Sequence, residues 1–438
     1  MKSRENILDE FYLSKTLISD LNIDINYINK KKLKELIHIF SKCDDFRKKY
    51  LVKFSYESMI MMIIISKICW KVEGFSEMAK WCKYHAKYLN ELEIIPDLIT
   101  PSYDTFRRFI SLFNAESLQE ETLYKIKDLF ENISKKSEEY KTKIKMASVD
   151  GKELRATGRK ENTLNPHSNL GTLNFVELSI GLCMVSKLID KKQNEISALK
   201  ELLPHLNLKG TILTADAIQC QRSICEDIIS KGGNYLIACK SNQKELLDDQ
   251  ELCFYSLNEE CNLSDSYLNK HIGKLITCER NNRRFRIIKL NKNYIGTSWP
   301  HVRSYIEIES KTHDKKNYSL KRYFISSLIN EELIYEAIEN RWTIEGDYHY
   351  EKDTLLYEDS FKCENRNAVK NMAVINSIIL GFFKVTKMLY NLSSSKEAKL
   401  KIASNPNEEI ANILSVINSD KLLKEINKQM RIKRKLNK

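Results

Sequence analysis

The spacing of apolar and polar positions changes along the chain and divides it into segments. Apolar residues recur at helical spacing through 54–70 and 106–113, which predicts a helical N-terminal domain over residues 1–135. The polar, charged stretch 136–143 is expected to be a linker. From residue 144 the pattern is that of an α/β domain. Short apolar or β-branched runs predict strands at 144–149, 173–178, 181–189, 211–215 and 235–239, and longer periodic runs predict helices at 195–203 and 219–230.

The order three strands, helix, strand, helix, strand predicts a mixed sheet with helices packed on it over residues 144–240. It also fits the ribonuclease H-like fold, in which the first strand and a later neighbouring strand each present an aspartate. Residues 241–330 carry short strand-like runs broken by Asn, Lys and Gly, which predict a β-rich insertion forming a separate lobe. Helix is expected again from 331 through about 353 and at 368–389, so that 331–390 supplies core helices, one of which carries Glu345. Residues 391–438 are expected to be a helical or basic tail.

Composition narrows the class of protein. The chain has 71 basic and 59 acidic residues, a net charge of +12, so a nucleic acid or an acidic membrane surface is the natural partner. A merely basic soluble enzyme is the alternative. The 11 cysteines include no Cys-x-x-Cys pair, which indicates reduced thiols in a cytoplasmic protein rather than a zinc site or disulfide framework. The apolar run 59–65 is too short to cross a membrane and is expected to be a buried helix.

Three acidic residues stand in positions that suit metal-dependent phosphoryl transfer. Asp150 follows the first predicted core strand, Asp216 follows the strand 211–215, and Glu345 lies in a helical stretch. Two strand-end aspartates and a helical glutamate can converge on a pair of divalent ions, which clamps the attacking and leaving oxygens of a phosphodiester. A turn at Asp150-Gly151 and a helix N-cap at Asp216 are the alternatives.

Basic and polar residues near these acids are candidate phosphate ligands. At about 100° per residue, Arg341, His349 and Lys352 share the helix face of Glu345, although an i,i+4 Arg–Glu pair on a solvated helix is the alternative. Lys152 follows Asp150 closely. After the strand 235–239, Lys240, Asn242 and Gln243 could hold a phosphate or a base edge, or could form a polar loop.

A basic run in the predicted insertion is a further DNA-binding candidate. Strand alternation places Arg284 and Arg286 on one face and Phe285 and Ile287 on the other. Changing both arginines to glutamate is expected to weaken DNA binding while leaving the melting temperature nearly unchanged. A solubilising strand edge is the alternative.

Taken together, these segments resemble the DDE transposases of bacterial insertion sequences, specifically the H-repeat-associated branch. The resemblance runs from about residue 50 to 390 and rests on the order and number of its motifs, each weak alone. The wider group carries a Tyr-x2-Arg-x3-Glu-x6-Lys signature, which Arg341, Glu345 and Lys352 fit, whereas Ile338 stands at the tyrosine position and Gly346 where the branch often has Asn. The matching stretches are Ser148–Lys152, Asn194–Ala198, Leu208–Ala217 with Cys220 and Gln221, Lys231–Tyr235, Lys240–Gln243, Tyr323–Ser327, Arg341–Glu345 and Asn367–Asn371, with Pro101–Arg108 in the helical N-terminal domain.

The resemblance implies a ribonuclease H-like catalytic core with Asp150, Asp216 and Glu345 as ligands of two Mg²⁺ ions, which Mn²⁺ can replace. It implies cleavage of transposon ends and strand transfer into target DNA. The expected partner is double-stranded DNA, bound by a homodimer in the bacterial cytoplasm at the nucleoid, with no membrane association. A catalytically silent DNA-binding derivative and a stand-alone nuclease of the same fold are the alternatives.

Overall fold

The computed structural model describes residues 47, 52–115, 118, 120–127, 145–158, 168–178, 181–189, 194–257, 265–292, 294, 296, 299–311, 319–341 and 344–417. Predictions for residues 1–46, for the linker 136–143 and for the tail beyond 417 lie outside the described residues. The chain divides into two compact units, one of residues 1–143, 152–190 and 345–438, and one of residues 144–151 and 191–344. The domains predicted from the sequence are instead consecutive segments of the chain, and this division into domains stays a prediction.

The N-terminal part of the first unit is helical where it is described. It contains α4 (Tyr56–Cys69), α5 (Phe75–Tyr84), α6 (Ala86–Glu91), α7 (Tyr103–Leu112) and a π-helical turn (Glu120–Tyr124). The run Met59–Ile65 within α4 is fully buried, which confirms the prediction of a buried helix. Ser102 caps α7 by accepting a hydrogen bond from the Thr105 N–H at 3.3 Å, as its position before the apolar run predicts.

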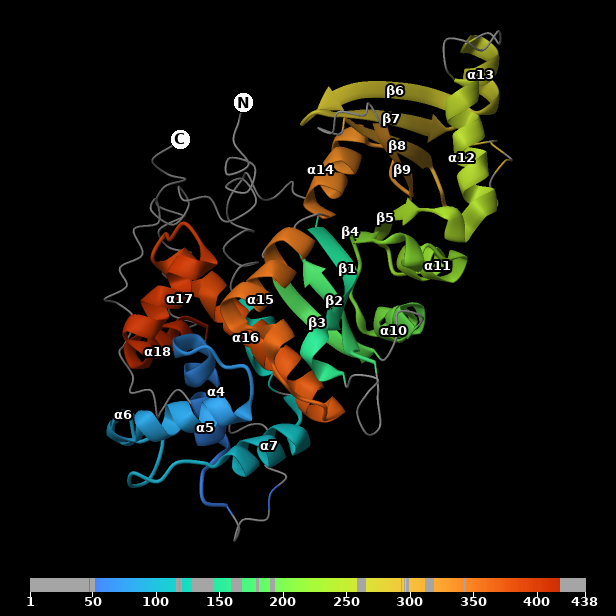
Figure 1. Cartoon of the computed structure of the whole chain (residues 1–438). Coiled ribbons are helices and arrows are strands. Elements are labelled where there is room, and N and C mark those ends of the chain that lie inside the picture. Colours follow the sequence, from blue (N-terminus) through green and yellow to red (C-terminus); the bar gives the residue numbers. More distant parts are fainter. Residues whose placement is uncertain are drawn as a thin grey trace, which may run out of the picture. The chain divides into compact units, whose positions relative to one another are not determined.

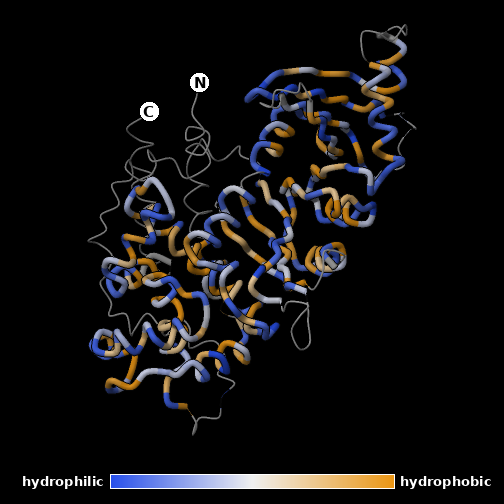
Figure 2. Tube along the Cα trace, viewed as in Figure 1, coloured by the Kyte–Doolittle hydropathy of each residue, from blue (hydrophilic) through white to orange (hydrophobic). Residues whose placement is uncertain are grey.

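The core of the first unit is built around one long helix (Figure 1). It contains the hairpin β2 (Leu170–Glu177) and β3 (Leu182–Ile189), and α15 (Tyr350–Leu356), α16 (Arg366–Leu389), α17 (Ser395–Ser404) and α18 (Pro406–Ile417). Helix α16 is long and apolar enough to cross a membrane, but 94% of its most apolar stretch is buried inside the protein. The hydrophobic residues along it are coloured orange in Figure 2. It is therefore a core helix.

The second unit begins with parallel strands. Here β1 (Lys145–Leu154) pairs with β4 (Thr211–Ala215), and β4 pairs with β5 (Asn234–Cys239). Helix α10 (Asn194–Leu202) precedes β4, and α11 (Arg222–Ser230) connects β4 to β5. The predicted strands and helices of this region are confirmed to within about three residues, except that β1 runs on to Leu154. They could be predicted because each buried strand is a short, strongly apolar run.

Residues 241–330 do not form a separate lobe, so that prediction is wrong. Two helices come first, α12 (Lys244–Ser256) and α13 (Asp265–His271), followed by β6 (Gly273–Arg280), β7 (Arg283–Leu290), β8 (Ser304–Lys311), β9 (Ser319–Ser326) and α14 (Glu331–Arg341). Strand β9 pairs antiparallel with β5, so the four new strands extend the core sheet. The sheet has nine strands in the order β3-β2-β1-β4-β5-β9-β8-β7-β6. Its first five strands form the expected ribonuclease H-like core of mixed strand direction.

Strand β7 is covered on both faces, which corrects the prediction for its arginines. Phe285 meets Tyr335 of α14 with ring centroids 5.2 Å apart. The next residue, Arg286, is buried and donates to Phe254 O of α12 at 2.9 Å and to Glu307 at 2.9 Å. Because α14 packs on one face of the strand and α12 on the other (Figure 1), both faces are covered around Phe285 and Arg286. Arg286 is therefore no DNA contact, although Arg284 is exposed.

Candidate active site

The two aspartates follow the last paired positions of neighbouring parallel strands. The β1–β4 register ends at Val149 opposite Ala215, so Asp150 and Asp216 leave the ladder at the same edge of the sheet. Strand β4 ends at Ala215, as predicted, but β1 continues to Leu154. Asp150 therefore lies inside a strand and not at its end. The same fact excludes a turn at Asp150-Gly151.

Asp216 is bound by two cationic side chains. It occupies the N-cap position of a short 3-10 turn but makes no capping hydrogen bond with its side chain. Its carboxylate instead accepts from Arg341 Nη2 at 3.0 Å, and Lys240 Nζ lies 3.7 Å away. Arg341 is mostly buried, with 13% of its side chain exposed, whereas the side chains of Asp216 and Lys240 are 40% and 67% exposed. A buried arginine thus orients a carboxylate that solvent can reach.

A further carboxylate lies beside Asp150, and the sequence prediction did not include it. Glu195, in the first turn of α10, is buried and packs its carboxylate against Gly151. A Cβ at position 151 would overlap this group, so the close approach requires glycine. The only sequence signal was that Glu195 belongs to one of the motifs shared with transposases.

Glu345 is exposed, and it does not lie in the continuous α-helix that was predicted. Helix α14 ends at Arg341, a π-helical turn spans Ile344–His349, and α15 begins at Tyr350. A π-helical turn takes i→i+5 hydrogen bonds, so 100° per residue does not apply across it. Such turns inside helices are frequent at functional sites.

The two lysines predicted to bind phosphate are buried in ion pairs. Lys352 is fully buried and lies 3.1 Å from Glu358. Lys152, with 7% of its side chain exposed, pairs with Asp353 and lies 3.0 Å from Glu358. Neither ammonium group is available to DNA, so both assignments to phosphate binding are corrected to structural ion pairs.

His349 is not a cation at neutral pH. Burial, together with the charges of Lys152 and Lys352, lowers the pKa of its imidazole from 6.5 to about 3. The amide nitrogen of Asn174 lies 3.3 Å from His349 Nε2 and can only donate, so this ring nitrogen carries no proton. Any contact between His349 and a phosphate would therefore involve a neutral ring, and this contact stays a prediction.

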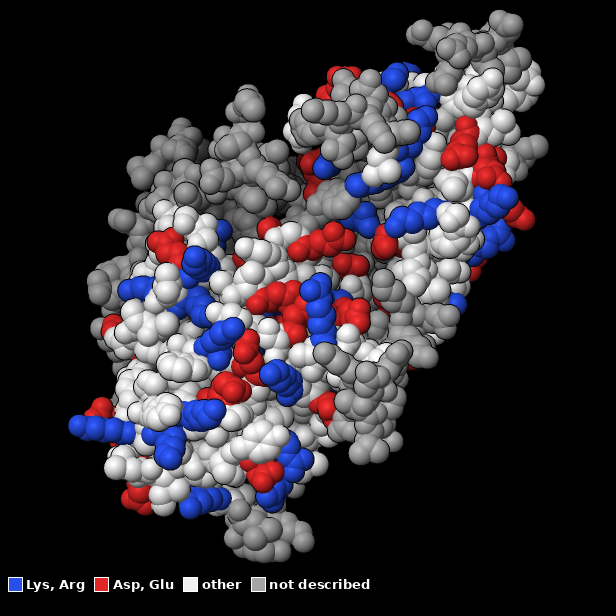
Figure 3. Space-filling view, viewed as in Figure 1, with Lys and Arg blue, Asp and Glu red and all other residues white. Residues whose placement is uncertain are grey.

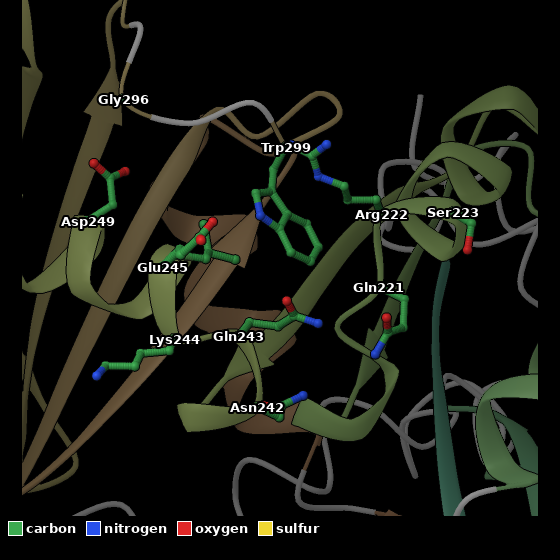
Figure 4. A pocket seen from close by; sticks show the side chains of 11 residues that line it. Gln221, Arg222, Ser223, Asn242, Gln243, Lys244, Glu245, Asp249, Gly296 and Trp299 are labelled. Carbon is green, nitrogen blue, oxygen red and sulfur yellow. The ribbon is translucent and has the colours of Figure 1, made fainter.

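Asn242 and Gln243, which follow β5, line one edge of a polar hollow (Figure 4). Asn242 donates to Ala217 O at 2.8 Å and Gln243 donates to Cys220 O at 2.9 Å, so both amide nitrogens are used to fix the segment that follows Asp216. The hollow has a volume of about 840 Å³, and at its border the Arg222 guanidinium lies over the Trp299 ring, 5.9 Å from the ring centroid. Lys240, which was predicted as a phosphate ligand together with Asn242 and Gln243, keeps an exposed ammonium group.

The residues of the second unit fit a divalent metal ion by their chemistry. Magnesium prefers carboxylate oxygens, and Asp150 and Asp216 supply them from adjacent strand positions at one sheet edge. The Glu195 carboxylate occupies the space that a Cβ on residue 151 would fill, so it brings a further negative charge close to Asp150. Within the described ranges, however, no three His, Cys, Asp or Glu side chains are grouped to hold an ion. The complete three-acid site, with Glu345, stays a prediction.

The chain is similar to known proteins over most of its length. The family model described as "Transposase DDE domain" matches residues 141–382, more than half of the chain, and a model for a domain associated with it matches 37–124. "Putative protein YbfL" and "H repeat-associated putative transposase YhhI", both of Escherichia coli K12, are each 26% identical over 400 residues, which is 88% of this chain and 98% of each relative. A cryo-EM structure of a piggyBac transposase synaptic complex with hairpin DNA aligns with 98% of this chain and 86% of that one, at 11% identity and a TM-score of 0.39.

Proposed function

We propose that this chain, which belongs to the DDE transposase family, cleaves the ends of a mobile DNA element and joins them to target DNA. The observation that carries the proposal is the pair Asp150 and Asp216 at one sheet edge, with Arg341 bonded to Asp216. A sheet edge that presents carboxylates with a fixed arginine suits metal-dependent attack on a phosphodiester. The nearly full-length likeness to an H repeat-associated putative transposase supports the same activity.

Asp150, Asp216 and Glu345 would hold two Mg²⁺ ions, with Mn²⁺ as a substitute. When bound, these ions would stabilise negative charge on the attacking and leaving oxygens. Arg341 keeps the Asp216 carboxylate in one orientation, and Lys240 offers an exposed charge to a phosphate beside it.

The proposed chemistry has two balanced steps. In the first, a water oxygen bonds to phosphorus and loses its proton while the 3′-oxygen leaves and gains one, which frees a 3′-hydroxyl. In the second, that hydroxyl attacks a phosphodiester of the target, and the target's 3′-oxygen leaves. Positioning and electrostatics carry reactions of this class.

We assign double-stranded DNA as the partner, with the protein acting as a homodimer in the bacterial cytoplasm. The excess of basic over acidic residues, 71 against 59, favours a negatively charged partner such as DNA. Contacts of this kind are salt-dependent, with log K falling by about 0.9 per phosphate for each tenfold increase in salt.

The test is cleavage of a DNA fragment that carries the ends of the element, with Mg²⁺. Asp150→Asn, Asp216→Asn and Glu345→Gln should each lower the cleavage rate at least ~100-fold, because each removes a metal ligand, while DNA binding in EDTA stays within about twofold. Substantial cleavage by the Asp216→Asn protein would remove that residue from the site. Binding without cleavage by the unaltered protein would support the silent derivative instead.

A further inference from the structure

A buried carboxylate joins two lysines from different parts of the first unit. Glu358 lies just after α15, and its side chain is 5% exposed. Its Oε1 accepts from Lys352 Nζ at 3.1 Å and from Asn376 Nδ2 at 3.0 Å. Its Oε2 accepts from Lys152 Nζ at 3.0 Å. We call these four residues the Glu358 clamp.

Each member of the clamp comes from a different element; one of these elements carries a proposed metal ligand, and another directly follows the turn that carries a second. Lys152 lies on β1, two residues after Asp150. Lys352 lies on α15, which follows directly on the π-helical turn that contains Glu345. Asn376 lies on the core helix α16. The clamp therefore anchors the segment bearing Glu345 to the most buried helix of the unit.

The clamp is ionised. Burial acts to raise the pKa of Glu358, but the charges of Lys352 and Lys152 outweigh it and hold this pKa well below its usual range. Lys152 has a second carboxylate partner in Asp353, whereas Glu358 is the acid that pairs with Lys352. The other recorded polar contact of the Lys352 ammonium is to Ala373 O, at 3.4 Å. Lys352 therefore depends on Glu358 more than Lys152 does.

We propose that Glu358 is a positioning residue, which fixes the direction of Glu345 by holding Lys352 of α15 against α16. The inference rests on the proposed function, in which Glu345 is a metal ligand. A π-helical turn lacks the regular i→i+4 ladder, so the orientation of Glu345 depends on where the following helix is anchored. Groups that orient metal ligands commonly change metal affinity or activity by about 10–100-fold when removed.

The variants separate positioning from folding. Glu358→Gln alone leaves Lys352 buried without a counter-charge, so it lowers stability as well as activity. The double variant Glu358→Gln with Lys352→Met removes both charges together, and Lys152 keeps Asp353. The matched control is Arg286→Met with Glu307→Gln, which removes an equally buried ion pair of the second unit, with side chains 7% and 2% exposed.

Two readouts are required, Mn²⁺ affinity measured by electron paramagnetic resonance and single-turnover cleavage of end DNA. In the Glu358→Gln, Lys352→Met protein we expect Mn²⁺ affinity to fall about tenfold, close to that of Glu345→Gln, and cleavage to fall at least about tenfold. DNA binding in EDTA and the melting temperature should match those of the control. Mn²⁺ affinity and cleavage equal to those of the control would overturn the proposal.

Failure of the clamp and failure of the proposed function give different results. If the unaltered protein binds Mn²⁺ but never cleaves end DNA, the proposed function fails, and Mn²⁺ affinity alone decides the role of Glu358. If Glu345→Gln binds Mn²⁺ as well as the unaltered protein does, Glu345 is no ligand and the positioning role is overturned with it.

Discussion

At the scale of single residues, the surroundings of a side chain decide its role more than its type does. Lys240, Lys152 and Lys352 are all lysines near proposed metal ligands. The first is 67% exposed beside Asp216, and the other two are buried against Glu358. The sequence could place all three near the acids, but it could not show that Glu358 lies between Lys152 and Lys352. The contact of Lys152 with Glu358 joins residues about 200 positions apart, which no local pattern encodes.

His349 gives a prediction in pH dependence. Its folded pKa of about 3 lies below the ordinary 6.5, so as pH falls the unfolded chain takes up the proton first. The stability due to the neutral ring is therefore complete above pH 6.5 and is lost as pH falls toward 3. The His349→Gln side chain stays neutral and can still accept from Asn174. Between pH 6.5 and 4.5, the free energy of unfolding of this variant should therefore fall by about 1–2 kcal/mol less than that of the unaltered protein.

The measurement is urea unfolding of both proteins at the two pH values. His205→Gln is the control, because this histidine is exposed and belongs to the other unit. An equal loss in the unaltered protein and in His349→Gln would show that His349 titrates as an ordinary histidine.

At the scale of elements, strands were easier to predict than their partners. The runs that became β4 and β5 are short, apolar and bounded by polar residues, so their existence and their limits follow from local pattern. The pairing of β5 with β9 joins residues more than 80 positions apart, and nothing local encodes it. Helix α12 was missed because exposed apolar residues such as Leu252 and Tyr255 blur its helical periodicity. The π-helical turn at Glu345 was missed because apolar periodicity does not separate it from an α-helix.

Strand β7 gives a prediction at this scale, which compares two neighbouring arginines. Arg286→Glu would bury a second carboxylate against Glu307, so it should lower the free energy of unfolding by about 3–5 kcal/mol. Arg284→Glu changes an exposed side chain and should alter it by no more than about 0.5 kcal/mol. Thermal or urea unfolding of the two single variants decides the matter. Equal stability of both would contradict the covering of β7 by α12.

At the scale of the whole molecule, the net charge of +12 does not by itself locate a DNA-binding surface. On the face shown in Figure 3, Lys and Arg side chains form one narrow run on the second unit and elsewhere lie among Asp and Glu side chains. Some basic residues are instead paired with acidic residues of the same fold. Arg283 pairs with Glu339, and Lys289 pairs with Glu331. Fold class and the two aspartates could be predicted from sequence, whereas the course of the DNA could not.

The central claim is that this transposase-family chain joins DNA as well as cutting it. The most direct measurement supplies a precut element end with a free 3′-hydroxyl, a separate target duplex and Mg²⁺, and sequences the products. The account predicts covalent joining of the end's 3′-oxygen to a target 5′-phosphate by the unaltered protein, lowered at least ~100-fold in Asp150→Asn, Asp216→Asn and Glu345→Gln. Nicked or shortened DNA without joined molecules, or joining that persists in all three variants, would contradict it.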